Sequence, residues 1–234
     1  QIFQYVASLS SSFGWVPEYA QWHPMSEEHC ETCCIRDMIE CALDLIDAGF
    51  DCWDLVDRYT RNQLSEQQVK DGCFVAVDNT RPDEDDKTWQ HMDERIVGGW
   101  SGGGEPNSIS LSRFRSIAGC CVGTAPQAVW AVWSRIVEER DGRVYVNLPM
   151  ACDRDAATVA TGYPKEGWWQ VTAKRDGDYF VRLRDWMGGR VQATVDGRDV
   201  PLLFADGCAV FRGVTTGSVI RLAHPLTTEV GRET

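Results

Sequence analysis

Apolar residues between Cys33 and Ala48 recur at steps of three and four, the spacing that one buried face of an α-helix requires. They are Ile35, Met38, Ile39, Ala42, Leu43, Leu45 and Ile46. Gly49 follows at the position where glycine commonly ends a helix. The pattern therefore predicts one long amphipathic helix that stops at this glycine.

A second helix is predicted from about Cys52 to Val69, because its apolar residues also follow the helical spacing. Its inward positions are Trp53, Val56, Tyr59 and Leu64. Two helices joined by a short glycine turn form an antiparallel pair, which is the repeating unit of an (α/α) barrel. Residues 2–9 read as the tail of an earlier helix.

The periodicity changes near residue 141. Before it, a helix is predicted from Thr124, a suitable N-cap residue, through Pro126 to about Arg140. After it, apolar and polar residues alternate in short runs separated by Asp-Gly and Gly-Gly turns, as in a β-sandwich. The runs cover residues 144–148, 168–172, 179–183, 191–195, 208–211 and 218–222. Helices followed by strands predict two domains, a helical domain over 1–141 and a β-sandwich over 142–234.

Composition narrows the classes of partner. The 234 residues carry a net charge of -12, which argues against nucleic acid or an anionic membrane as the ligand. No apolar run approaches the roughly 18 residues that a membrane span needs. Gln1 and the apolar start of the chain suggest a fragment or one half of a split protein, so a secretory signal could be hidden and the location stays open.

Ten cysteines are many for this length. Three fall within residues 30–34 and two are adjacent, a clustering poorly suited to distant disulfides. We therefore favour reduced thiols and a reducing, cytoplasmic compartment. The remaining cysteines have no visible partner and are expected to pack as small apolar residues: Cys41, Cys52, Cys73, Cys152 and Cys208.

Two cysteine-containing stretches together offer a metal site. Glu31 and Cys33, joined by Cys120 and Cys121, supply one carboxylate and three thiolates, which suit a tetrahedral zinc ion. The adjacent cysteines precede a predicted helix, whose positive N-terminal end favours a thiolate. Two alternatives stay open: thiols that are merely buried, and a redox or structural-zinc CxxC pair formed by Cys30 and Cys33.

The run Glu31-Thr32-Cys33, followed by an apolar helix and then by Cys120-Cys121, resembles the cysteine-dependent β-L-arabinofuranosidases of glycoside hydrolase family 127. The resemblance implies that Glu31, Cys33, Cys120 and Cys121 hold zinc and that Cys120 is the nucleophile that attacks the sugar. One departure concerns the segment after the cysteines, where Val122-Gly123-Thr124-Ala125 replaces the prolines and asparagine usual in the family. This departure puts the choice of substrate in doubt.

The resemblance covers most of the chain but only the later part of the family's pattern. It implies part of an (α/α)6-type helical barrel followed by a β-sandwich, with a homodimer through the β-domain or a complementing N-terminal segment as partner. The matching stretches are residues 54–68, 144–148, 163–167, 182–186 and 195–197.

The resemblance also implies a glutamate upstream of the metal motif as general acid and base. Glu18, in Gly14-Trp15-Val16-Pro17-Glu18, is the nearest match, with Glu27 and Glu28 as rivals. The surrounding loop, rich in tryptophan, proline and histidine, is a plausible rim of the site and includes His23. Trp100 lies in a glycine-rich stretch that reads either as a lid with a sugar platform or as a surface loop.

The sequence therefore predicts a retaining glycoside hydrolase that uses a zinc-bound thiolate as nucleophile and a glutamate as acid and base, with an arabinofuranoside-type carbohydrate as substrate. The alternative is an inactive carbohydrate-binding or scaffolding fragment in which the zinc is purely structural.

Overall fold

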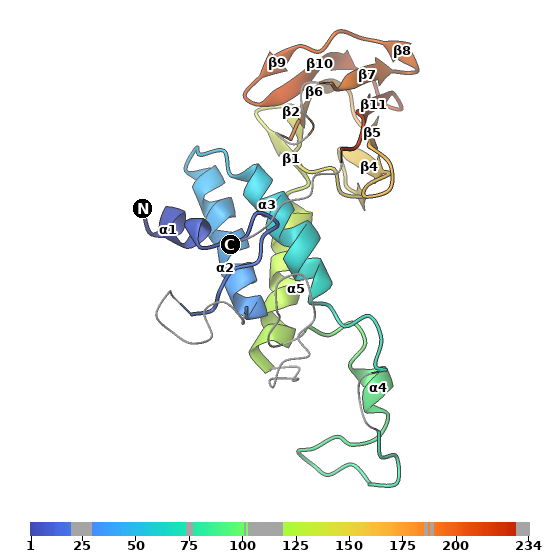
Figure 1. Ribbon diagram of the computed structural model, residues 1–234. Helices are drawn as coiled ribbons and strands as arrows, with labels where there is room; N and C mark the ends of the chain where they lie inside the picture. The colour runs from blue at the N-terminus through green and yellow to red at the C-terminus, as the bar shows by residue number, and fades with distance from the viewer. Residues whose placement is uncertain are drawn as a thin grey trace. The chain divides into compact units, whose positions relative to one another are not determined.

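The computed structural model describes residues 1–19, 30–73, 77–100, 102, 119–184, 187 and 190–227. The chain forms two compact units, Gln1–Trp130 and Ala131–Thr234 (Figure 1). The domain boundary near residue 141 stays a prediction. None of the helices in the described ranges is long and apolar enough to cross a membrane.

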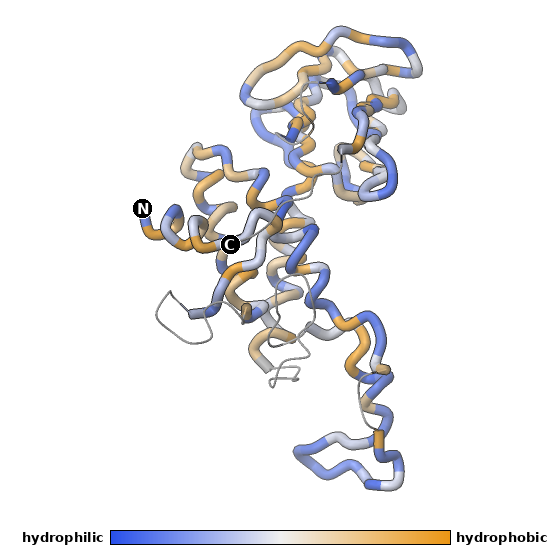
Figure 2. Tube along the Cα trace, in the orientation of Figure 1, coloured by the Kyte–Doolittle hydropathy of each residue, from blue (hydrophilic) through white to orange (hydrophobic). Residues whose placement is uncertain are grey.

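The first unit contains helices. Their bounds are α1 (Ile2–Ser8), α2 (Thr32–Asp47), α3 (Trp53–Tyr59), the π-helix η1 (Thr60–Leu64), α4 (Met92–Arg95) and α5 (Gly119–Ser134). The last of these continues into the second unit. The short α4 precedes the glycine-rich stretch that contains Trp100, and the segment before it is largely hydrophilic (Figure 2).

The predicted pair of helices is confirmed in α2 and α3. The apolar face of α2 is buried as expected, except that Leu45 is only half-buried. Gly49 adopts a φ of +93° just after the helix, a conformation that glycine tolerates best. All four inward positions of the second helix are buried: Trp53, Val56, Tyr59 and Leu64. Its regular α-helix ends at Tyr59, however, and a π-helical stretch follows.

The predicted bounds of the helix from Thr124 to about Arg140 are wrong at both ends. α5 begins at Gly119 and ends at Ser134, so Pro126 lies inside it rather than in its first turn. Val137–Arg140 forms a strand, β1, that pairs antiparallel with β2 (Arg143–Val146). Pairing with a neighbouring strand overrides the helical spacing of these few residues.

The second unit contains two β-sheets, as the alternating pattern predicts. In the five-stranded sheet the order is β1-β2-β6-β10-β9, and in the six-stranded sheet it is β3-β4-β5-β11-β7-β8. The remaining bounds are β3 (Cys152–Asp153), β4 (Ala157–Thr161), β5 (Trp168–Ala173), β6 (Gly177–Arg182), β7 (Gln192–Val195), β8 (Arg198–Asp199), β9 (Phe204–Ala205), β10 (Cys208–Val214) and β11 (Val219–Ala223).

Asp-Gly pairs make three tight turns of these sheets. Asp141, Asp196 and Asp206 adopt φ values of 51°, 51° and 53°, and the glycine after each also has a positive φ. Two successive residues of positive φ are what a type I′ hairpin turn needs, which explains this dipeptide between antiparallel strands. The turns join β1 to β2, β7 to β8 and β9 to β10.

The six-stranded sheet has one buried face in its centre. Along β5 buried residues alternate with half-buried ones, and Trp169 and Val171 pair with Leu222 and Ile220 of β11. All four of these side chains are completely buried. From β6 of the other sheet, the Tyr179 hydroxyl donates a hydrogen bond of 2.8 Å to the carbonyl of Ala156, the residue before β4. This bond links the two sheets, and Phe180, Cys208 and Val210 form a further buried cluster with Tyr145 packed against it.

Gly167, next to β5, has no room for a side chain. A Cβ there would lie 2.1 Å from the carbonyl oxygen of His224, a backbone atom that cannot move aside cheaply. We expect Gly167→Ala to lower the free energy of unfolding of the second unit by about 1–3 kcal/mol, measured by urea denaturation.

The matched control is Gly123→Ala in α5, where a Cβ would meet no atom within 4 Å. Alanine favours a helix over glycine by about 0.5–1 kcal/mol, so this variant should be neutral or more stable. Equal destabilisation by both changes would contradict the steric explanation.

Candidate functional site

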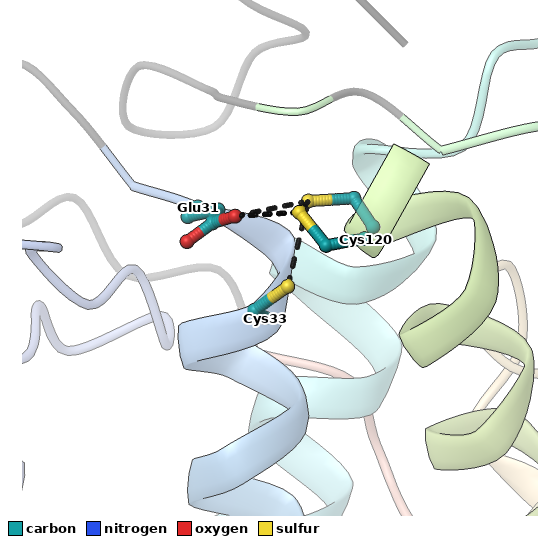
Figure 3. A group of neighbouring side chains, drawn as sticks. Glu31, Cys33 and Cys120 are labelled. Atoms are coloured by element: carbon teal, nitrogen blue, oxygen red, sulfur yellow. Dashed lines mark hydrogen bonds between the residues drawn. The ribbon is translucent and has the colours of Figure 1, made fainter. Parts of the chain in front are cut away.

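Two helix N-termini bring the predicted metal ligands together. Glu31 occupies the N-cap position of α2 with an extended backbone, and Cys33 lies in the first turn of that helix. Cys120 and Cys121 lie in the first turn of α5. Glu31 and Cys33 point toward Cys120 across the space between the helix starts (Figure 3). The cysteine pair therefore belongs to the helix, whereas the sequence had placed it ahead of one.

One ligand atom from each of the four residues lies within 4.8 Å of all the others. The Sγ atoms of Cys33 and Cys121 are 3.6 Å apart, and those of Cys120 and Cys121 are 3.7 Å apart. Glu31 Oε1 lies 3.1 Å from the Cys120 sulfur and 3.5 Å from the Cys121 sulfur. This cluster, Glu31 with the three cysteines, could hold a metal ion.

The distances fit a tetrahedral zinc site. With zinc–sulfur bonds of about 2.3 Å, the sulfur atoms of such a site are about 3.8 Å apart. The two sulfur–sulfur distances, 3.6 and 3.7 Å, are close to this edge length. Three thiolates and one carboxylate are also among the donors that zinc accepts. Both the donor set and its spacing therefore suit the ion.

Thr124 adds a polar contact to the cluster. It lies one helical turn after the cysteine pair in α5, and its hydroxyl oxygen is 3.3 Å from the Cys33 sulfur. A hydroxyl can donate a hydrogen bond to a thiolate, and this contact works to lower the pKa of Cys33. Sequence reasoning treated Thr124 only as a helix cap and missed this contact.

Without a cation, the cluster disfavours thiolates. Burial is the main cause that raises the pKa of Cys33, and it raises the pKa of Cys121 further. For Cys121 the neighbouring Cys33 adds to burial, since two negative groups so close repel each other. A divalent ion would remove this repulsion, so the arrangement is one that a metal ion stabilises.

The CxxC reading receives no support. Cys30 is completely buried, and burial raises the pKa of its thiol to about 12. Reactive thiols of redox pairs have a lowered pKa instead. Burial also raises the pKa of Cys34 to about 12, with a further contribution from the Glu31 carboxylate. These two thiols are therefore the inert members of the Cys30–Cys34 group.

Of the other predicted site residues, Glu18 and Trp100 fall within the described ranges. Glu18 is half-buried, and its charge contributes to the raised pKa of Cys34 after burial and Glu31, yet it is not among the four clustered ligands. The indole nitrogen of Trp100 donates a 3.0 Å hydrogen bond to the carbonyl of Leu64. Their roles as acid/base and as sugar platform stay predictions. Three predicted residues lie outside the described ranges: His23, Glu27 and Glu28.

The expectation that the five remaining cysteines pack in cores is confirmed for two of them. Cys152 and Cys208 are buried, whereas Cys52 is half-buried. For Cys41 and Cys73 the expectation is wrong, because both are exposed. The helical spacing places Cys41 on the outer face of α2, a position that the preference of cysteine for burial obscured.

With this geometry in place, solved structures offer a comparison. A β-L-arabinofuranosidase of glycoside hydrolase family 127 from Geobacillus stearothermophilus T6 is 18% identical with a TM-score of 0.57, over 94% of this chain and 36% of that chain. A β-arabinofuranosidase of the same family is 17% identical with a TM-score of 0.59, over 90% of this chain and 33% of that one. A third structure, a glycoside hydrolase, is 20% identical with a TM-score of 0.55, over 84% and 33%.

The chain shares the fold of these glycoside hydrolases. The resemblance suggested by the motif around Glu31 is thus confirmed at the level of the fold, over most of this chain. The chain spans about a third of the length of these proteins, and the partial (α/α)6-type helical barrel stays a prediction. No protein-family model and no curated protein matches the sequence.

The raised pKa values predict how metal affinity depends on pH. The thiols of Cys33 and Cys121 stay protonated through neutral pH in the metal-free chain, so each must lose a proton when it binds a metal ion. Each such proton makes the apparent affinity rise about tenfold per pH unit, so these two thiols alone contribute a rise of about a hundredfold. Competition with a chromophoric chelator between about pH 6 and pH 8 should show this slope. An affinity for zinc that does not change with pH would contradict it.

Proposed function

We propose that the chain carries the zinc-binding and nucleophile-bearing part of a retaining glycoside hydrolase that acts on β-L-arabinofuranosides. The observation that carries the proposal is the four-residue cluster, in which Glu31 and the sulfurs of Cys33, Cys120 and Cys121 converge within 4.8 Å. The shared fold supports it, since two of the similar structures are named as arabinofuranosidases of family 127.

The four cluster residues would hold zinc. There it would keep the ligating thiols deprotonated at neutral pH and moderate their nucleophilicity. Cys120 is the most accessible ligand, since it is exposed, Cys121 is buried and Cys33 is half-buried. An exposed sulfur in the first turn of α5 is the one that a substrate can approach, so Cys120 is the nucleophile.

The reaction takes two displacements at the anomeric carbon. In the first, the Cys120 thiolate attacks this carbon, the glycosidic carbon–oxygen bond breaks, and Glu18 gives its proton to the departing oxygen. In the second, the Glu18 carboxylate removes a proton from water, the water oxygen attacks the same carbon, and the carbon–sulfur bond breaks to return the thiolate. Two inversions give net retention of configuration.

Recognition of the sugar would involve the loop around His23 together with Trp100. The similar structures are about three times as long as this chain, so a further segment or a second polypeptide would supply the rest of the sugar pocket. A homodimer through the β-domain is the other form of assembly that the resemblance implies. We propose a reducing, cytoplasmic environment for the protein, because the clustered thiols must stay reduced to bind zinc.

A second function is a structural zinc site in a carbohydrate-binding or scaffolding protein. The short length relative to the similar structures favours it, because residues needed to bind and distort the sugar could lie outside this chain. In that case the ion ties the start of α2 to the start of α5 without turnover.

The test combines metal analysis with covalent trapping. The purified chain should contain one zinc per molecule, hydrolyse an aryl β-L-arabinofuranoside, and gain one pentosyl group on Cys120 that mass spectrometry detects. Cys120→Ser should abolish the labelling and lower turnover by about a thousandfold or more, because a serine hydroxyl is not ionised at neutral pH.

Cys41→Ser is the matched control, because Cys41 is, like Cys120, an exposed thiol, but it lies in α2 outside the cluster. It should leave zinc content, labelling and turnover unchanged. Zinc without labelling or turnover would support the structural function, and a chain that binds no zinc under reducing conditions would overturn both.

A further inference from the structure

Gln67 is an amide side chain in a place where an apolar one would be expected. It follows the π-helix η1, and its side chain is completely buried. A buried amide is costly unless its polar atoms find partners, so its hydrogen bonds indicate why it is there.

The partners of Gln67 are the two residues on either side of Glu31. Its Oε1 accepts a 3.0 Å hydrogen bond from the hydroxyl of Thr32. Its Nε2 donates a 3.3 Å hydrogen bond to the carbonyl oxygen of Cys30 and lies 3.7 Å from the sulfur of the same residue. Cys30 and Thr32 are themselves completely buried, so water cannot replace either bond.

Glu31 depends on this support for its direction. Its backbone is extended, with φ of -86° and ψ of 140°, and its side chain makes no capping hydrogen bond to α2. The carboxylate instead reaches across to the sulfurs of Cys120 and Cys121. Fixing the residue before and the residue after determines where the Glu31 side chain leaves the backbone, and therefore where its carboxylate lies.

We propose that Gln67 is the positioning residue that holds the Glu31 carboxylate at the metal, by hydrogen bonds to Cys30 and Thr32 on either side of it. This inference rests on the proposed zinc site. It assigns a role to a residue that does not touch the ligand atoms, and it explains why an amide rather than an apolar side chain fills this buried position.

The experiment uses cobalt(II) in place of zinc, because its absorption reports the site directly. The near-ultraviolet band reports thiolate ligands, and the visible bands report coordination geometry. Gln67→Met keeps the volume and removes the hydrogen bonds. It should retain the thiolate band, shift the visible bands toward those of Glu31→Gln, and weaken cobalt binding about 10- to 100-fold. Gln68→Leu is the control, because the amide of Gln68, the next residue, donates its hydrogen bond to the carbonyl of Gly98 and not to Cys30 or Thr32.

Two further comparisons separate positioning from general stability. If Gln67 acts through Glu31, then Gln67→Met should add less than about twofold in the Glu31→Gln background. Thr32→Val should reproduce part of the loss while keeping the bond to Cys30, and Thr32→Ser, which keeps the hydroxyl, should restore binding. The Thr32 pair also provides the answer if Gln67→Met fails to fold.

The outcomes are distinct. Unchanged cobalt affinity and unchanged visible bands in Gln67→Met would overturn the inference while leaving the metal site intact. An equal loss with and without the Glu31 carboxylate would also overturn it. A wild-type chain that binds no cobalt would instead overturn the proposed function, and this inference with it.

Discussion

The mutual crowding of one carboxylate and three thiols is the constraint on which the first unit depends. Cys33 and Cys121 have raised pKa values because they are buried and close to other acidic groups. Once ionised, the four groups repel one another at these short distances. A divalent cation converts the same repulsion into four favourable contacts. The starts of α2 and α5, which are far apart in the sequence, therefore meet where a metal ion would join them.

Local rules predict the parts of the fold that local interactions determine. The apolar spacing in α2 locates its buried face, because a helix with one apolar side must turn that side inward. The Asp-Gly pairs at 141, 196 and 206 locate three hairpin turns, because the required positive φ values are tolerated by few residues. The four residues of the cluster were also named in advance as candidate ligands, since their residue types suit a metal ion even before their proximity is known.

Long-range interactions determine what the sequence did not reveal. Residues 137–140 form a strand because β2 is available to pair with them, which helical spacing cannot anticipate. The π-helix Thr60–Leu64 changes the phase of the chain after α3, so Gln67 turns toward α2 rather than along a regular helical face. Nothing in the residues around Gln67 signals this direction, because its partners, Cys30 just before α2 and Thr32 at its start, are far away in the sequence.

Pro126 lies inside α5 and affects how firmly the helix holds Cys120 and Cys121. Proline lacks the N–H that would otherwise donate a hydrogen bond to the carbonyl of Val122. One backbone hydrogen bond of α5 is therefore absent directly after the turn that bears Cys120 and Cys121. The first turn of α5 is consequently less rigidly held than the later turns. The start of α5, which bears the two sulfurs, is therefore tied to the later turns by one hydrogen bond fewer than a regular helix provides.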